Sequence, residues 1–308
     1  MEDVVRLSFT LIFLSILLRY RYMKRLLLFG AKGTLGQAVA ALFERDDTYT
    51  VIQIDKDDCD ITDEHAVNAL FEKEQPDMVI NAAAVNAVDT IETDAAVYDL
   101  ATEVNGIAPG RLALYAKEHG SVFVHYSTDY VFDGVQADGY AEDAAPHPLS
   151  RYAETKLLGE TEVMKAEADA YIIRISRLFG KAGVGEGSKR SFVDTMIHLA
   201  AEKDHLDVVT DQISSPSYAP DVALFTKKVL EESYPFGIYH GANSGGCSWY
   251  GWAKEIFDIK NIDIDVSPVP ASQFPRPAKA PMHSMLLNTK GPVQRRWQDA
   301  LLAYLDTI

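Results

Sequence analysis

The stretch RLLLFGAKGTLG at residues 25–36 decides the fold class. An apolar run of strand length, Arg25–Phe29, leads directly into glycines at Gly30, Gly33 and Gly36. Glycines at a strand-to-helix turn let the backbone turn sharply and approach a pyrophosphate. The free N–H groups and the dipole of the following helix then favour the phosphate charge. The spacing therefore predicts a turn that binds a dinucleotide.

The sequence after this turn supports that prediction. Glycine turns are common, so the motif alone also fits a purely structural turn. Here a helix is expected from near Thr34, and a second strand, Val51–Ile54, ends at Asp55, where a carboxylate can accept hydrogen bonds from an adenosine ribose. Asp55 favours the free ribose hydroxyl of NADH, whereas Lys32 and Lys56 would pair with the 2′-phosphate of NADPH. The choice between NADH and NADPH stays open.

Short apolar runs alternate with amphipathic stretches of helix length along most of the chain. This is the pattern of βαβ units, and it predicts an α/β fold, a Rossmann doubly wound parallel sheet. Beyond about Lys181, the segments KAGVGEGSK, SSPSYAP and PVPASQFPRPAKAP break the pattern and predict a smaller lobe. The expected strands are Arg25–Phe29, Val51–Ile54, Met78–Ile80, Ser121–Ser127, Tyr171–Ile175 and Leu206–Val209, and the expected helices begin near Thr34, Glu64, Asp94, Ser150 and Ser191.

The same pattern divides the chain into three parts. Residues 1–22 form an extension whose apolar run, LSFTLIFLSILL, is shorter than the roughly 20 residues that span a bilayer, so it is interpreted as a start-site artefact or a weak anchor. Residues 23–180 are expected to form the NAD(P)-binding Rossmann domain. Residues 181–308 are expected to form mainly the substrate lobe, with segments at about 200–232 returning to the Rossmann domain. A cleft between two such lobes is the usual place for a ligand.

Composition excludes several classes of function. The 308 residues are 47% hydrophobic and 24% charged, as in ordinary globular proteins. The net charge of −16 would repel a nucleic-acid backbone, so nucleic acid is not an expected partner. Cys59 and Cys247 have no metal-ligand spacing, so no metal is expected, and free thiols fit a reducing compartment, the cytoplasm. Membrane contact is not expected, and the oligomeric state, a homodimer included, is left open.

Tyr152 and Lys156, in RYAETK, stand four residues apart on a segment expected to be helical. That spacing places the phenol and the ammonium on one helix face, and a nearby cation lowers the pKa of a phenol. Tyr152 could then exchange a proton with a carbonyl or alcohol oxygen. The same spacing is common in surface pairs. Here, however, Thr128 ends the fourth strand, and its hydroxyl could donate to the same oxygen.

The sequence resembles the extended short-chain dehydrogenase/reductases and, within them, the dTDP-4-dehydrorhamnose reductase family. The resemblance runs from Met23 to the C-terminus and is carried by GAKGTLG, by INAAAVNAVD at 80–89, by HYSTDYVFDG at 125–134, by Tyr152 with Lys156, and by DQISSPSYAPD at 211–221. It implies NADPH or NADH as the hydride source and a nucleotide-linked keto sugar as the substrate. The implied reaction is reduction of the C4 keto group of dTDP-4-dehydro-L-rhamnose to dTDP-L-rhamnose.

The resemblance also implies roles for single residues. Tyr152 would supply a proton to the developing alkoxide, Lys156 would lower the pKa of Tyr152 and hold the nicotinamide ribose, and Thr128 would polarise the carbonyl. The expected cofactor-binding residues are Gly30, Lys32, Gly33, Thr34, Leu35, Gly36, Asp55, Asp60, Ile61, Ala82, Ala83, Ala84, Asn105, Tyr152 and Lys156. The expected substrate-binding residues are Asn86, Thr128, Asp129, Arg177 and Pro216.

Several of these residues have a plain structural alternative. Asp60 either holds the adenine or caps the helix at Glu64, and Asp63 is at least as good a cap. The small side chains after Asn81 would let the cofactor lie against the sheet, but tight core packing explains them equally. For Arg177, a solvated side chain is the alternative to a sugar or phosphate contact.

Three positions depart from the family pattern. Arg177 stands where the family has a tryptophan that faces the sugar, and Val85-Asn86 stands where it has tyrosine or histidine followed by threonine. The expected R-P-x-N-S appears as APMHS at 280–284. Other functions therefore stay open: a reductase or epimerase of another keto sugar, or a regulatory subunit like the beta subunit of methionine adenosyltransferase. A 4,6-dehydratase is disfavoured, because those enzymes place Asp-Glu after the threonine and here Tyr130 follows Asp129.

Overall fold

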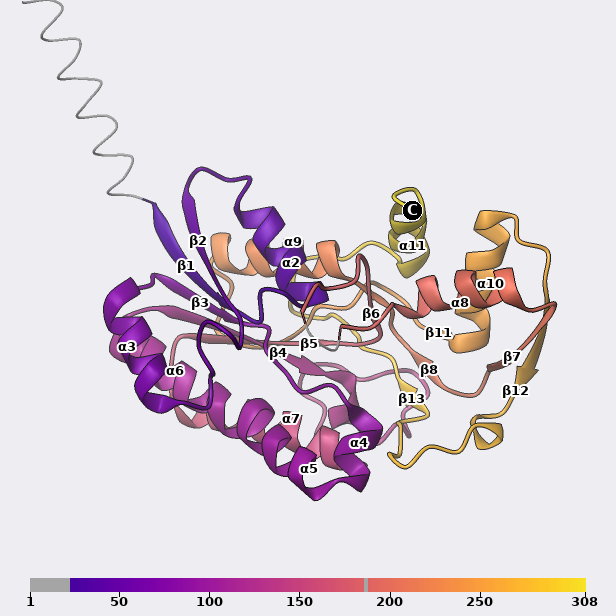
Figure 1. Cartoon of the computed structure of the whole chain (residues 1–308), viewed down its shortest axis with the longest axis horizontal. Coiled ribbons are helices and arrows are strands. Elements are labelled where there is room, and N and C mark those ends of the chain that lie inside the picture. Colours follow the sequence, from indigo (N-terminus) through magenta and orange to yellow (C-terminus); the bar gives the residue numbers. More distant parts are fainter. Residues whose placement is uncertain (1–22, 186–187) are drawn as a thin grey trace, which may run out of the picture.

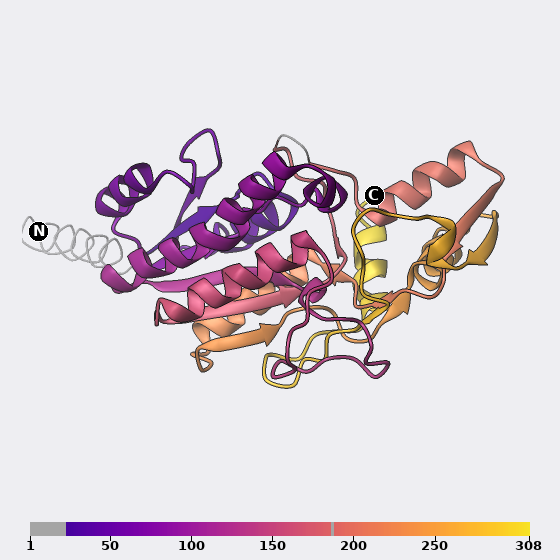
Figure 2. The same ribbon diagram turned by 90° about the horizontal axis from the view of Figure 1, so that it is seen from below.

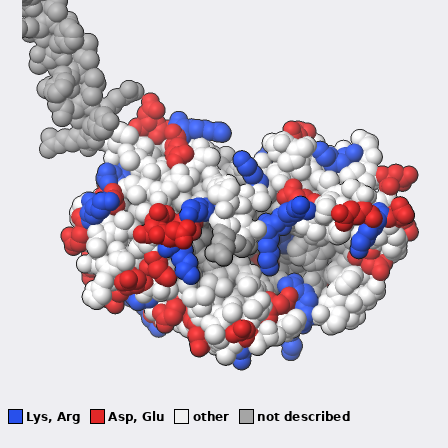
Figure 3. Space-filling view, viewed as in Figure 1, with Lys and Arg blue, Asp and Glu red and all other residues white. Residues whose placement is uncertain are grey.

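The computed structural model describes residues 23–185 and 188–308 (Figure 1). The extension at 1–22, with its two interpretations as an artefact or an anchor, lies outside the described residues. The described residues form a sheet domain and a smaller lobe, which lie end to end in Figure 2. A hollow separates the two parts on the face shown in Figure 3.

The sheet domain is built on six parallel strands, which confirms the predicted doubly wound α/β fold. Their order is β10-β5-β4-β3-β1-β2, so the chain leaves β1 toward one edge and returns to build the other. The carboxyl ends of β1 and β3 therefore meet where the strand order reverses, which is where such sheets bind ligands. The strands are β1 (Lys24–Phe29), β2 (Tyr49–Ile54), β3 (Met78–Asn81), β4 (Val122–Thr128), β5 (Ala170–Ile175) and β10 (Gly237–His240).

Helices cover both faces of the sheet, because alternate strand residues point to opposite sides. Leu26 and Leu28 of β1 belong to the core beneath α2 and α9. Leu27 and Phe29 belong to the core beneath the helices on the other face. The helices of this domain are α2 (Thr34–Phe43), α3 (Glu64–Glu74), α4 (Val88–Thr93), α5 (Ala95–Ala101), the π-helical turn η1 (Thr102–Ile107), α6 (Ala108–Glu118), the 3₁₀ turn η2 (Asp129–Val131), α7 (Arg151–Lys165) and α9 (Ala219–Glu231).

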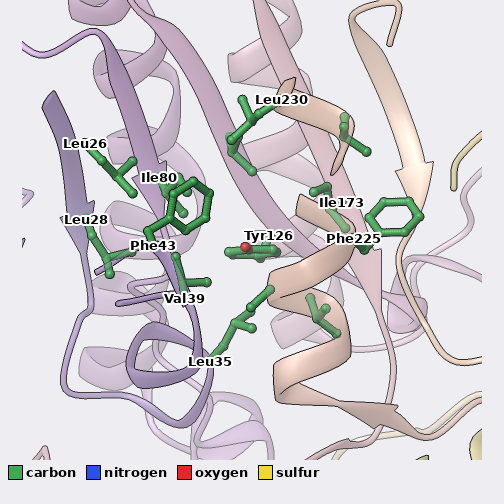
Figure 4. Packing of buried hydrophobic residues seen from close by; sticks show 14 of the residues in the cluster. Leu26, Leu28, Leu35, Val39, Phe43, Ile80, Tyr126, Ile173, Phe225 and Leu230 are labelled. Atoms are coloured by element: carbon green, nitrogen blue, oxygen red, sulfur yellow. The ribbon is translucent and has the colours of Figure 1, made fainter. Parts of the chain in front are cut away.

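Figure 4 shows how the first of these cores fixes α9 to the sheet. Phe225 and Leu230 of α9 lie in the same apolar cluster as Ile173 of β5. The phenol of Tyr126 in β4 lies 2.8 Å from the hydroxyl of Thr226, so its one polar atom is hydrogen-bonded within the core. A helix from late in the chain thus completes a core begun at residue 26.

Side-chain caps set the helix starts that the sequence predicted. Ser150 accepts the N–H of Ala153 and begins α7, the helix that carries Tyr152. Asp63 caps α3, as the sequence analysis allowed, and Ser191 forms a capping box at the start of α8. Capping oxygens satisfy N–H groups that have no partner within the helix.

The smaller lobe has its own core around the buried Trp252. Its sheets are short: β11-β8-β13, β12-β7 and β6-β9. Its elements are β6 (Leu178–Phe179), α8 (Phe192–Glu202), β7 (His205–Val209), β8 (Ile213–Ser214), β9 (Ser217–Tyr218), β11 (Cys247–Ser248), α10 (Trp249–Lys260), β12 (Asp265–Val269), η3 (Ala271–Gln273), β13 (His283–Ser284) and α11 (Trp297–Leu305).

One predicted strand forms but pairs with a different strand than expected. The strand expected at Leu206–Val209 forms as β7, but it pairs with β12 in the lobe and not with the parallel sheet. The sixth strand of that sheet is β10, which pairs with β5 and which the sequence analysis did not list as a strand. Of the segment at about 200–232, α9 packs on the sheet domain through α2. Four residues of β10 between glycine and proline turns give too little periodicity to predict.

Candidate active site

The glycine turn is packed so closely that side chains do not fit. Gly30 has φ +74°, and a Cβ there would lie 2.5 Å from the N of Ala83. A Cβ on Gly36 would lie 2.1 Å from the carbonyl oxygen of Gly30. Gly33 precedes α2 as its N-cap and has no side chain to occupy the first N–H groups of the helix. The turn thus presents backbone donors and a positive helix end, which fits the pyrophosphate of a dinucleotide.

Residues around the turn hold it in place. Asp55 accepts the N–H of Lys32 at 3.0 Å, so the end of β2 is tied to the glycine turn. The hydroxyl of Thr34 accepts the N–H of Gly183 at 3.1 Å, and the carbonyl of Lys32 accepts the N–H of Val184 at 2.9 Å. The glycine-rich segment after β6 therefore packs directly on the expected phosphate site.

The predicted ribose residues lie together at the end of β2. Oδ1 of Asp55 accepts the N–H of Lys56 at 2.9 Å. The ammonium of Lys32 pairs with the carboxylate of Asp57 at 3.0 Å, and this contact raises the pKa of Lys32. The backbone N–H groups of both predicted lysines therefore donate to Asp55, and the ammonium of Lys32 is already paired with Asp57.

The remaining expected cofactor residues lie in a loop, in the two cores of the sheet domain and directly after β3. Oδ1 of Asp60 accepts the N–H and the hydroxyl of Thr62, which lowers the pKa of Asp60, so this carboxylate shapes the loop and does not cap α3. Leu35 and Ile61 are buried in the two cores of the sheet domain. The partly buried residues Ala82, Ala83 and Ala84 follow β3.

Asn105 has a structural task that the sequence did not reveal. It is fully buried in η1, where Oδ1 accepts the N–H of Val85 at 2.8 Å and Nδ2 donates to the Val85 carbonyl at 3.0 Å. Nδ2 also contacts the hydroxyl of Thr155 at 3.2 Å. Because these contacts occupy the amide, Asn105 joins the segment after β3 to α7, and its expected contact with the cofactor stays a prediction.

Three predicted residues meet at the carboxyl edge of the sheet. Thr128 ends β4, and Tyr152 lies in the first turn of α7. The phenol of Tyr152 donates to Oδ1 of Asn86 at 3.4 Å, and the nearby hydroxyl of Thr128 favours ionisation of the phenol. Asn86 is exposed, whereas Thr128 and Tyr152 are buried. A carbonyl oxygen bound here would meet two hydroxyl donors on one side.

The pKa of Tyr152 departs from the sequence prediction. A lowered pKa was expected from the cation of Lys156, but burial raises the pKa of Tyr152 well above its usual value, and this outweighs the contact with Thr128. The phenolate loses its hydration in the buried site, while the ammonium of Lys156 donates elsewhere. Tyr152 is consequently protonated at neutral pH, which is the form that an acid needs.

The side chain of Lys156 is buried against β4. Nζ donates to the carbonyl oxygen of Tyr126 at 2.7 Å and lies 3.5 Å from Nε2 of His125. Burial lowers the pKa of Lys156 to about 8, although the charge of Glu160 opposes this. Lys156 is therefore largely charged at pH 7 and loses its proton in the mildly alkaline range.

His125 is a site residue that the sequence analysis did not single out. It is fully buried, and its Nδ1 lies 3.3 Å from Nδ2 of Asn81, whose Oδ1 accepts the N–H of Ala83. The ring thus lies between the amide of Asn81 and the ammonium of Lys156. Burial, with the ammonium of Lys156, holds the pKa of His125 well below its usual range. Its only sequence signal is its place three residues before Thr128.

The expected substrate residues lie at the junction with the lobe. The buried Asp129 accepts the hydroxyl of Ser284, and burial raises its pKa. Arg177 has φ +43° and donates to the carbonyls of Gln212 and Cys247, with its guanidinium 3.8 Å from the ring centre of Trp249. The guanidinium of Arg177 is therefore bonded within the protein, although the residue is only partly buried, and its contact with the substrate stays a prediction. Pro216 is buried between β8 and β9.

Comparison with known proteins identifies the family. A family model described as the RmlD substrate binding domain matches residues 23–308. A dTDP-4-dehydrorhamnose reductase from Aggregatibacter actinomycetemcomitans is 35% identical over 296 residues, covering 91% of this chain and 97% of that protein. The chain belongs to the dTDP-4-dehydrorhamnose reductase family.

Two further similar proteins show how close the similarity is. A crystal structure of the Bacillus anthracis dTDP-4-dehydrorhamnose reductase in complex with NADP superimposes with a TM-score of 0.86 at 32% identity, covering 92% of this chain and 99% of that one. A probable dTDP-4,6-dihydroxy-2-methyloxan-3-one 4-ketoreductase from Streptomyces antibioticus is 38% identical over 265 residues, covering 85% of this chain and 86% of that protein. The Rossmann-like fold predicted from the sequence is thus that of the dTDP-4-dehydrorhamnose reductase family.

Across residues 23–185 and 188–308, no group of three or more His, Cys, Asp and Glu side chains could hold a metal ion. In the same ranges, no helix has both the length and the apolar character to cross a bilayer.

Proposed function

We propose that this protein is an oxidoreductase that reduces the C4 keto group of dTDP-4-dehydro-L-rhamnose to dTDP-L-rhamnose with NADPH or NADH. Residues 23–180 would bind the cofactor, and residues 181–308 would bind mainly the sugar nucleotide. The observation that carries the proposal is the meeting of Tyr152, Thr128 and Asn86 at the carboxyl edge of the sheet, beside the glycine turn.

The cofactor site fits a pyridine dinucleotide on structural grounds. The cradle formed by Gly30 and Gly36 admits no side chain, and α2 begins behind it without a side-chain cap. Asp55 stands at the end of β2 for the adenosine ribose, and Lys156 is placed to hold the nicotinamide ribose. A nicotinamide bound here supplies the hydride.

The protein's own residues then handle the oxygen of the substrate. Thr128 donates a hydrogen bond to the carbonyl oxygen and polarises it. Tyr152, protonated at neutral pH because of its burial, donates its proton to the alkoxide that forms as C4 is reduced. Any stabilisation of the remaining phenolate by Lys156 would act through its charge alone, because its ammonium donates to the carbonyl of Tyr126. Asn86 accepts the phenol hydrogen bond before reaction and so orients Tyr152.

A direct assay tests this proposal. NADPH oxidation is followed with dTDP-4-dehydro-L-rhamnose generated in the reaction, comparing the wild type with Tyr152→Phe. Turnover that falls by about 10²–10⁴ in the variant, with unchanged NADPH affinity, is the expected result. A wild type that binds NADPH and turns over no keto sugar contradicts the proposal and favours a regulatory role.

A different keto sugar is the second candidate substrate. The Streptomyces antibioticus relative is named for another dTDP-linked ketone. Arg177, stacked on Trp249, also stands where the family pattern has a tryptophan. Parallel assays with other nucleotide-linked 4-keto-6-deoxy sugars distinguish the two candidates by kcat/KM.

The proposal includes a cytoplasmic location and a homodimer. Cys59 and Cys247 are both free thiols, as is usual in a reducing compartment. Twofold dimers are the commonest soluble oligomers. Cell fractionation and light scattering test these two points; a membrane-bound protein or a strict monomer would contradict them.

A further inference from the structure

An ion pair, in which two guanidinium nitrogens of Arg276 share one carboxylate oxygen of Asp89, joins the lobe to the sheet domain. Nε and Nη2 of Arg276 both donate to Oδ2 of Asp89, at 3.0 and 2.9 Å. The N–H of Ala278 lies 3.4 Å from Oδ1 of the same carboxylate. Asp89 lies in the first turn of α4, whereas Arg276 comes from the proline-bearing segment between η3 and β13. The contact therefore spans the junction where the substrate is expected.

This pair lies next to the reaction centre. The charge of Arg276 acts on the phenol of Tyr130, and the ring of Tyr130 packs edge-on against Tyr152, with 5.8 Å between ring centres. Asp89 follows Asn86, which accepts the phenol of Tyr152, by three residues. A single side chain thus separates the Arg276 cation from the catalytic tyrosine.

Arg276 differs from the other arginine at this junction. Arg177 is partly buried, and its guanidinium is bonded to two backbone carbonyls and stacked on Trp249. The side chain of Arg276 is 48% exposed, and that of Asp89 is 40% exposed. A half-exposed carboxylate contributes little net binding energy, so a second anion can replace it. A guanidinium fork matches phosphate oxygens as well as carboxylate oxygens.

The charge of the whole protein makes such a cation important. The net charge of −16 repels a substrate that carries a diphosphate. Figure 3 shows Asp and Glu spread over the outer surface and several Lys and Arg side chains bordering the central hollow. Local cations at the hollow can offset the long-range repulsion where the substrate enters.

We propose that Arg276 binds the diphosphate of the nucleotide sugar and that Asp89 competes with this diphosphate for the guanidinium. The inference rests on the proposed function, because it needs a nucleotide-linked substrate. When the substrate binds, Arg276 exchanges the carboxylate for phosphate oxygens. Asp89 therefore sets the affinity of the site, and the two residues affect binding in opposite directions.

Calorimetric titration of the full-length protein with dTDP tests this. Arg276→Ala should raise the Kd for dTDP by about tenfold or more, because charge-assisted hydrogen bonds are lost, and Arg276→Lys should raise it less. Asp89→Asn, which keeps the shape and removes the charge, should lower the Kd several-fold. Arg25→Ala is the control, because Arg25 pairs with Glu74 at the start of β1, about 13 Å of strand from the carboxyl edge.

A purely structural role for the Arg276–Asp89 pair predicts a different result. If the pair merely fastened the lobe, Arg276→Ala and Asp89→Asn would both weaken dTDP binding or both leave it unchanged, and either result overturns the proposal. A loss of NADPH affinity in Arg276→Ala would assign the cation to the cofactor and also overturn it. Failure of the proposed function gives a different result. No keto sugar is then reduced, while dTDP or UDP still binds and the Arg276→Ala and Asp89→Asn variants still shift its Kd in opposite directions. A wild type that binds neither nucleotide refutes the diphosphate site.

Discussion

The hydroxyl of Ser284 donates to the buried carboxylate of Asp129, and this hydrogen bond connects β13 of the lobe to the turn that follows β4. Asp129 is adjacent in sequence to Thr128, so the lobe is fastened beside the proposed catalytic hydroxyl. Burial raises the pKa of Asp129 even though Ser284 and the charge of Arg177 oppose the shift. The site therefore keeps a carboxylate at a cost in stability.

Asp129→Asn should stabilise the fold at pH 7 by about 1 kcal/mol or more and lower the rate of reduction. A carboxyl whose folded pKa is raised favours the folded state below its unfolded pKa, and this advantage is lost as pH rises through the folded pKa. The melting temperatures of wild type and variant should therefore converge toward pH 4. A constant difference across pH 4–7 would mean that the Asp129 charge is not the cause.

Gly30→Ala should destabilise the protein by more than about 2 kcal/mol and abolish NADPH binding. The new Cβ would meet the backbone of Ala83 at 2.5 Å, at φ +74°. Gly120→Ala is a matched control, because Gly120 has φ +68° with nothing within 4 Å of its Cβ, and it should cost only about 1 kcal/mol. Urea unfolding of both variants measures the difference, and equal losses would rule out the close contact as the cause.

The rate of reduction should fall as pH rises through about 8, where Lys156 loses its charge. Lys156→Arg should retain some activity and move this decline to higher pH, because a guanidinium stays charged. The measurement is kcat between pH 6 and 10 for both proteins. An unchanged alkaline limb in the arginine variant would remove Lys156 as its source.

Arg174→Met should destabilise the protein by about 3–5 kcal/mol, because it leaves Glu160 buried without its partner. Nη2 of Arg174 lies 2.6 Å from Oε2 of Glu160, and both side chains are at most 3% exposed. The double variant with Glu160→Met should recover much of this loss. Arg296→Ala, which breaks an exposed pair with Asp299, is the control and should change the free energy of unfolding by less than about 1 kcal/mol. If Arg174→Met and Arg296→Ala lowered the free energy of unfolding equally, burial of the Arg174–Glu160 pair would not be the cause.

Local sequence signals predicted the elements that depend on near neighbours. The capping residues Asp63, Ser150 and Ser191 act within one helical turn, and the alternation in β1 sorts its side chains to two faces within a few residues. The exception is β10, whose four residues become a sheet strand through pairing with β5, about 65 positions earlier. No feature of the sequence near β10 indicates that it pairs with β5.

For the site, the sequence by itself determined the glycine turn and the set Thr128, Tyr152 and Lys156, because motif spacing and parallel strand ends bring such residues to one edge. Only the tertiary structure decided how these groups are charged. Burial reverses the expected shift at Tyr152, and Lys156 turns to the carbonyl of Tyr126 beside His125. It also decided the meeting of Arg276 with Asp89, 187 positions away. Burial and long-range contacts arise only when distant segments pack together. They therefore could not be predicted from local sequence patterns.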